Sequence, residues 1–303
     1  MTGAQQDIDV RPVEIVTQDG RTLRGDHILP THRPPHAAVL CCASTATPRY
    51  IYKKFATHLA RQGFASILFD YQGISESRTL PLRQDPATKR SWASLDMPAA
   101  LDRLEEEHPA LPLFLLGHSV GGQLMGLMPN RHKLCAVASF AATYGYWGYM
   151  PSPTRYGVFA LWHGVMPVAL RLLGYTPARL FGFGEDMPAG VGADWARWGR
   201  RPDYFEPELS QEPGFVDLTI PWLNVLASDD AVASPQSAEA LMRAYPNMER
   251  ELIVLRPEEY GLKAIGHMGF FKESHAALWP IISGWLLEQS ERISRVKREE
   301  RSP

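Results

Sequence analysis

Short apolar runs alternate with segments of helical periodicity along most of the chain. The apolar runs predict buried strands over residues 37–43, 64–70, 111–117, 134–141, 221–227 and 249–255. A hairpin pair of strands is predicted over residues 13–17 and 22–29. Helices are predicted over residues 50–63, 91–108, 120–128, 234–245 and 272–289. This order of strands and helices is typical of an α/β fold in which helices cover both faces of a mostly parallel sheet.

One long segment, residues 143–215, interrupts the alternation. It is rich in aromatic residues and holds four of the eight tryptophans: Trp147, Trp162, Trp195 and Trp198. A stretch of this length between sheet elements is usually a lid or a small inserted subdomain. We therefore expect a helical cap over residues 143–215, inserted into a core made of residues 1–142 and 216–290, with a charged, solvated tail over residues 291–303.

Composition excludes several classes of function. The 303 residues carry a net charge of −2, which gives no basic excess for binding nucleic acid. No signal peptide is expected from MTGAQQDIDVRP, and the apolar stretch YGVFALWHGVMPVAL is too interrupted to predict a membrane span. The three cysteines have no metal-binding spacing, so we expect reduced thiols, a cytoplasmic protein and neither a metal nor another cofactor. The oligomeric state is not indicated.

The stretch FLLGHSVGG, residues 114–122, carries the first sign of chemistry. It contains a G-x-S-x-G match centred on Ser119, between a predicted strand and a predicted helix. In such a sharp turn, small residues on either side avoid a clash, and the serine hydroxyl stands exposed above the start of the helix. The motif alone is weak, but this context favours Ser119 as a nucleophile.

A nucleophilic serine needs a base, and this architecture places an acid and then a histidine after the serine in the sequence. Among the histidines that follow Ser119, His267 alone lies between glycines, after the last predicted strand and before the last helix. The other candidates, which are less well placed, are His132, His163 and His275. Asp229 and Asp230 directly follow a predicted strand. We prefer Asp230 as the acid that orients His267, and expect Asp229 to cap the next helix.

With these residues placed, the chain resembles the α/β-hydrolases, and the resemblance covers nearly all of it. It is most similar to bacterial hydrolases of the serine aminopeptidase and lysophospholipase type. The similar stretches are FATHLARQGFASILFDYQGISES, LLGHSVGGQ, VLASDDAVASP and IGHMGFF. The first of these contains a turn that is normally structural in the family, so Asp70 is given no chemistry.

The resemblance implies an oxyanion hole built from two backbone N–H groups, one of them on Val120. The second would lie in CCASTATPRY, where the chain lacks the His-Gly pair of many family members. Thr45 is the preferred donor, with Ser44 and Ala46 as alternatives.

These expectations describe a serine hydrolase that cleaves an ester, thioester or amide of a small, partly apolar substrate through an acyl-enzyme. The cap aromatics would cover an acyl or aromatic group of that substrate. Two other functions remain open. One is an acyltransferase or cofactor-independent peroxidase with the same triad, and the other is a non-catalytic binding protein on this fold.

Overall fold

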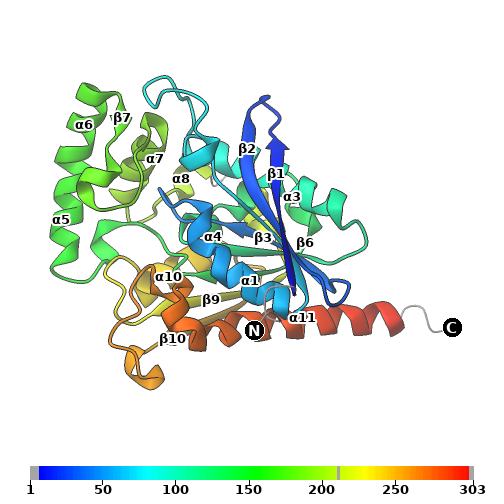
Figure 1. Ribbon diagram of the computed structural model, residues 1–303. Helices are drawn as coiled ribbons and strands as arrows, with labels where there is room; N and C mark the ends of the chain where they lie inside the picture. Colours follow the sequence, from blue (N-terminus) through cyan, green and yellow to red (C-terminus); the bar gives the residue numbers. More distant parts are fainter. Residues whose placement is uncertain (1–6, 210–211, 300–303) are drawn as a thin grey trace, which may run out of the picture.

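An eight-stranded sheet forms the centre of the protein in a computed structural model that describes residues 7–209 and 212–299 (Figure 1). The strands run in the order β1-β2-β4-β3-β5-β6-β9-β10. Their bounds are β1 (Ile8–Val16), β2 (Thr22–Pro30), β3 (Ala37–Cys42), β4 (Phe64–Phe69), β5 (Leu113–His118), β6 (Leu134–Phe140), β9 (Pro221–Ala227) and β10 (Glu249–Leu255). From β4 to β10 neighbouring strands are parallel, whereas β1 and β2 form an antiparallel hairpin at one edge.

Helices flank this sheet. They are α1 (Lys53–Arg61), α2 (Lys89–Ser91), α3 (Met97–Glu107), α4 (Val120–Gln123), α10 (Pro235–Arg243) and α11 (Trp279–Glu299). The β3, β4 and β5 strands are buried along their whole length, which explains why they are continuous apolar runs in the sequence. The alternation of strands and helices predicted from the sequence is confirmed, and the fold class is a mostly parallel α/β fold.

Two predicted helices have the wrong length. The helix expected over residues 120–128 ends at Gln123, because the Tyr245 hydroxyl donates to the Gln123 carbonyl (2.6 Å) and accepts from the Gly126 N–H (3.1 Å). The Tyr245 side chain, which lies just after α10, thus binds a carbonyl and an N–H group that would form helical hydrogen bonds if α4 continued. The final helix, expected to end near residue 289, instead continues to Glu299 within the segment expected to be a tail.

The segment between β6 and β9 forms a separate group of helices, which we call the cap (residues 143–215). Its elements are α5 (Thr154–Ala160), α6 (Met166–Leu173), β7 (Tyr175–Thr176), β8 (Met187–Pro188), α7 (Ala189–Gly199), α8 (Glu206–Leu209) and α9 (Gly214–Asp217). In Figure 1, α5, α6 and α7 gather at the upper left, away from α11, which runs along the bottom. Inside the cap, Trp162 packs in a small apolar cluster with residues from α5, α6 and α7.

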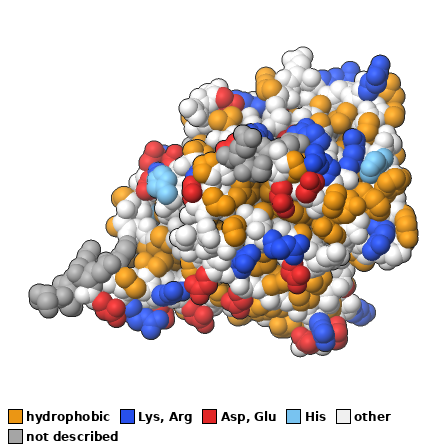
Figure 2. Space-filling model, turned by 180° about the vertical axis from the view of Figure 1, so that it is seen from behind, with side chains coloured by type: hydrophobic (Ala, Val, Ile, Leu, Met, Phe, Trp, Pro, Cys, Tyr) orange, Lys and Arg blue, Asp and Glu red, His pale blue; other side chains and the backbone are white. Residues whose placement is uncertain are grey.

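The outer surface of the cap is apolar. A π-helical turn, Leu161–Val165, joins α5 and α6 into one helix, Thr154–Leu173. In the described part of the chain, this is the one helix long and apolar enough to cross a membrane by length and composition, and only 22% of its most apolar window is buried. Leu172 on this helix and Leu180 just after it are exposed, and Figure 2 shows hydrophobic side chains gathered along the right-hand edge of the molecule.

Candidate active site

A strained turn carries Ser119 between β5 and α4. The residue has φ 51° and ψ −113°, a conformation that side-chain-bearing residues rarely adopt. The turn needs glycine on both sides. A Cβ on Gly117 would lie 2.5 Å from the Gly122 nitrogen, and one on Gly121 would lie 2.2 Å from the Cys42 oxygen. The glycine pattern is therefore a steric requirement of this turn, which leaves Ser119 partly exposed between buried neighbours.

His267 and Asp230 lie together at the carboxyl ends of β10 and β9. His267 Nδ1 is 2.7 Å from Asp230 Oδ2, and the Asp230 side chain is fully buried. The other Asp230 oxygen accepts the Val232 and Ala233 N–H groups, which fixes the carboxylate. A histidine held in this way at Nδ1 has Nε2 free to exchange a proton with a neighbouring group.

The prediction that Asp229 caps the following helix is wrong. Its two carboxylate oxygens accept the backbone N–H groups of Ile265 (2.9 Å) and Gly266 (3.0 Å). The side chain that caps α10 is that of Ser234. The two neighbouring aspartates therefore hold the same loop in different ways, Asp230 by the His267 ring and Asp229 by the backbone just before it.

A buried chain of hydrogen bonds connects three segments of the site. The Ser44 N–H donates to the Tyr52 hydroxyl (2.9 Å), which lies 2.7 Å from His118 Nδ1, and His118 Nε2 lies 2.9 Å from the His267 carbonyl oxygen. Because that carbonyl can only accept, His118 carries its proton on Nε2, and the Tyr52 hydroxyl donates to Nδ1. Burial keeps the His118 ring neutral by lowering its pKa well below the usual value.

The region expected to form the oxyanion hole lies beside Ser119. Val120 is the first residue of α4, so its N–H has no acceptor within the helix. Among the alternatives for the second donor, the Ser44 N–H is occupied by Tyr52. In the described chain no acceptor is found for the Thr45 N–H, and Thr45 lines the same cavity as Ser119. The next residue, Ala46, has φ 62° and its carbonyl accepts the Glu185 N–H from the cap (2.8 Å).

A cavity of about 630 Å³ lies between the core and the cap. Ser119, His267 and Thr45 line it from the core, and Trp162 and Trp195 line it from the cap. Two of the four cap tryptophans thus face the same space as Ser119 and His267. The other two, Trp147 and Trp198, do not line the cavity, and Trp147 packs instead against Phe159 and His163.

The charged residues that line this cavity are Lys89, Arg179 and Glu185. Glu185 is paired with Arg78 (3.3 Å) and lies 3.9 Å from Arg179. Lys89 is buried, and its ammonium lies 4.5 Å from the centre of the Trp195 ring. Burial lowers the pKa of Lys89 to about 7, partly opposed by the charge of Asp194.

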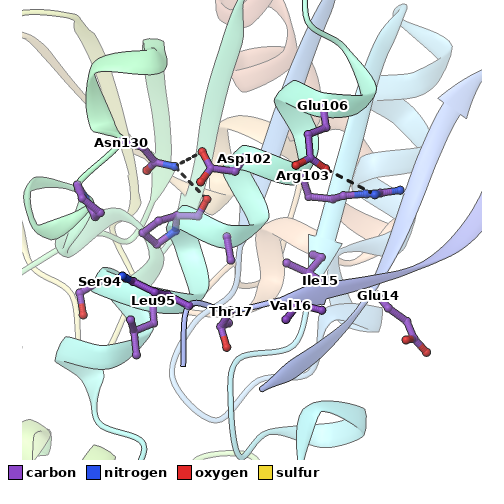
Figure 3. A pocket seen from close by; sticks show the side chains of 14 residues that line it. Glu14, Ile15, Val16, Thr17, Ser94, Leu95, Asp102, Arg103, Glu106 and Asn130 are labelled. Carbon is purple, nitrogen blue, oxygen red and sulfur yellow. Dashed lines mark hydrogen bonds and ion pairs between the residues drawn. The ribbon is translucent and has the colours of Figure 1, made fainter. Parts of the chain in front are cut away.

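A second hollow, of about 540 Å³, lies between β1 and α3 and holds none of the predicted site residues (Figure 3). Among its polar side chains, Asn130 Nδ2 contacts Asp102 (2.6 Å) and the Pro98 carbonyl (2.9 Å), and Arg103 pairs with Glu106 (3.6 Å). No histidine lines this hollow, whereas Ser119 and His267 both line the cavity under the cap.

Sequence reasoning missed three residues of the site. His118 was visible beside Ser119 but had no pattern that predicted its partners. Tyr52 lies in a segment predicted only as a helix, and Lys89 lies just before another predicted helix. Their positions depend on contacts with residues far along the chain. The other histidines lie elsewhere: His163 is on the exposed cap, and His275 Nε2 contacts the Ala264 carbonyl (2.8 Å).

Comparisons with known proteins agree with this geometry. Residues 33–178 match the model of a hydrolase family described as serine aminopeptidase, S33. A monoglyceride lipase from Saccharomyces cerevisiae has a similar structure, with a TM-score of 0.66 and 15% identity over 92% of this chain and 96% of that one. Brefeldin A esterase, a bacterial homologue of human hormone sensitive lipase, has a TM-score of 0.61 and 14% identity over 96% of this chain and 80% of that one.

An esterase from Thermogutta terrifontis is also similar, with a TM-score of 0.56 and 18% identity over 92% of this chain and 99% of that one. No curated protein sequence matches the chain. At these identities the structural likeness establishes the fold. It agrees with the strand order, and the chain has the α/β-hydrolase fold.

Proposed function

We propose that this protein is a serine hydrolase that cleaves an ester, thioester or amide through an acyl-enzyme. The observation that carries the proposal is the shared cavity of Ser119 and His267, with His267 held by the buried Asp230 carboxylate at 2.7 Å. A strained serine that shares a cavity with an oriented histidine supports nucleophilic acyl transfer. The esterases and lipases with similar structures support the same reaction class.

In the proposed reaction, Ser119 attacks the carbonyl carbon while His267 takes the hydroxyl proton at Nε2. The Asp230 carboxylate stabilises the imidazolium that forms. The N–H groups of Val120 and Thr45 donate to the oxygen that becomes negatively charged. His267 then protonates the leaving group, and water attacks the acyl-enzyme with His267 again as the base.

The experiment is ester hydrolysis by single and double variants. Ser119→Ala and His267→Ala should each lower kcat by roughly 10³-fold or more, and the double variant should be little worse than either, because the two groups act as a unit. Circular dichroism should show that each variant is folded. Turnover close to wild type in folded Ser119→Ala would contradict the mechanism.

The two neighbouring aspartates give a matched pair of variants. Asp230→Asn should lower kcat by roughly 10³-fold, because it removes the acceptor that orients His267 Nδ1 and leaves an amide there. Asp229→Asn keeps one acceptor oxygen for the Ile265 and Gly266 N–H groups, so we expect a loss of no more than about tenfold. Comparing kcat/KM on one activated ester checks the ranking, and the reverse ranking would mean that Asp229 is the acid.

A further inference from the structure

Resting on the proposed function, we infer that the substrate carries a carboxylate and that Lys89 binds it inside the cavity. Lys89 begins α2, in the core, and its side chain extends under the cap to the face of Trp195. Its exposed fraction is 1%, yet it lines the same cavity as Ser119 and His267. Lys89 is therefore placed to contact a ligand that enters this cavity.

The protein itself does not neutralise this lysine. In the described part of the chain, no carboxylate lies within 4 Å of Lys89 Nζ. Asp194, whose charge favours the ammonium, binds Arg197 Nη2 (2.7 Å) and the Arg90 N–H (3.4 Å). The Trp195 ring offers the ammonium a cation–π contact, which is weaker than the cost of burying an ammonium.

A buried lysine without an acid partner is destabilising unless something else occupies the site. An apolar side chain of similar length would fill the same space at lower cost, so the ammonium is more readily explained by binding than by packing. An anion that enters the cavity supplies the missing partner.

The charge of the site favours a carboxylate over a phosphate. Arg179 is 65% exposed and shares Glu185 with Arg78, so Lys89 is the one deeply buried cation among the described cavity residues. One ammonium neutralises one carboxylate, whereas a phosphate dianion in these apolar surroundings would keep an uncompensated charge. The aromatic and aliphatic lining then suits the carbon chain between the carboxylate and the scissile carbonyl.

The test compares acidic esters with neutral esters of equal length. One series is the mono-p-nitrophenyl esters of succinic, glutaric and adipic acids, matched with p-nitrophenyl butyrate, valerate and hexanoate. A second pair, 4-acetoxybenzoate and its methyl ester, places the carboxylate on the leaving group. In at least one series, wild type should prefer the acidic ester, and Lys89→Met should lower kcat/KM for that ester by roughly 10–100-fold.

The ratio of kcat/KM for the acidic ester to kcat/KM for its neutral partner should fall by a similar factor in Lys89→Met, and the melting temperature of this variant should equal or exceed that of wild type. Lys54→Met, which removes an exposed lysine paired with Glu273, is the control for net charge. An equal loss on acidic and neutral esters with a lower melting temperature would make Lys89 structural and overturn the inference. So would an unchanged preference in Lys89→Met.

The two proposals fail in different ways. If neutral esters are cleaved in a Ser119-dependent reaction and no acidic ester depends on Lys89, the carboxylate inference is wrong and the hydrolase proposal stands. If no ester in either series is cleaved and Ser119 does not react with an acyl-enzyme probe, the hydrolase proposal itself is wrong and the inference falls with it.

Discussion

At the scale of single residues, the Tyr52 hydroxyl connects the proposed oxyanion hole to the loop that carries His267. It accepts from the Ser44 N–H, next to the proposed oxyanion donor Thr45, and donates to His118, which in turn donates to the His267 backbone. The group is buried, and burial raises the pKa of Tyr52 above its usual value, so it stays protonated as a donor. Tyr52 is thus a positioning residue that acts through Ser44 and His118.

Replacing Tyr52 by Phe tests this role. The ring contact with Phe271 (centroids 4.7 Å apart) would remain, while the Ser44 N–H and His118 Nδ1 would both lose their partner. We expect kcat to fall by about tenfold with KM nearly unchanged, because the lost bonds align catalytic groups and do not contact the substrate. Steady-state kinetics on an activated ester measure the split. A variant that loses thermal stability but keeps the wild-type kcat would show that the chain of hydrogen bonds is only structural.

At the scale of elements, the sequence predicts what local periodicity determines and misses what distant side chains impose. The buried strands β3, β4 and β5 are found from their apolar runs, and the Ser119 turn from its glycines. The end of α4 is missed because it depends on the Tyr245 hydroxyl, which is far away in the sequence. No local sequence pattern predicts such a contact.

The end of α11 is missed for a different reason. Charge alone suggests a solvated tail after residue 290, yet Ile293 packs against the core and continues the buried face that includes Leu286 and Ser290. Helical spacing of these three positions supports the helix despite the charged residues between them. The burial of Lys89 is also missed, because it depends on the packing of the cap and not on any local pattern in the sequence.

The cap offers a matched pair of aromatic variants. Trp162 lines the cavity, whereas Trp147 lies in the same cap without lining it. We expect Trp162→Ala to lower kcat/KM for long-chain esters by about tenfold or more and to affect p-nitrophenyl acetate much less, because a short acyl group never reaches the lost surface. Trp147→Ala should leave the chain-length preference unchanged. Equal losses on all chain lengths in Trp162→Ala would mean that the cap only stabilises the protein.

At the scale of the whole molecule, the parallel sheet explains why residues far apart in the sequence meet. Ser119 follows β5, Asp230 follows β9 and His267 follows β10, and the carboxyl ends of parallel strands share one edge of the sheet. The cap is inserted between β6 and β9 and closes over this edge. The meeting of Ser119, Asp230, His267 and the cavity thus follows from a single topology.

A buried histidine pair couples the stability of the molecule to pH. His27 on β2 lies 3.0 Å from His108, Nε2 to Nε2, at the end of α3. Burial, followed by the charge of His108, lowers the pKa of His27 to about 4. Since the unfolded chain takes up this proton near pH 6.5 and the folded protein only near pH 4, the free energy of unfolding should fall as the pH falls through this range.

We expect His27→Gln to reduce this acid-dependent loss by on the order of 1–3 kcal/mol between pH 7 and pH 4.5. Denaturant unfolding at the two pH values measures it. His132→Gln, at an exposed histidine, is the control and should follow the wild type. Parallel losses in wild type and His27→Gln would show that other groups cause the acid sensitivity.

The central claim is that Ser119 forms a covalent acyl-enzyme, and one measurement tests it most directly. The purified protein is treated with a fluorophosphonate, and the modified site is located by mass spectrometry of its peptides. The account predicts one adduct per chain, on Ser119, with labelling abolished in Ser119→Ala and strongly slowed in His267→Ala. A folded wild-type protein that remains unlabelled, or that is labelled at the same rate on another residue in Ser119→Ala, would contradict it.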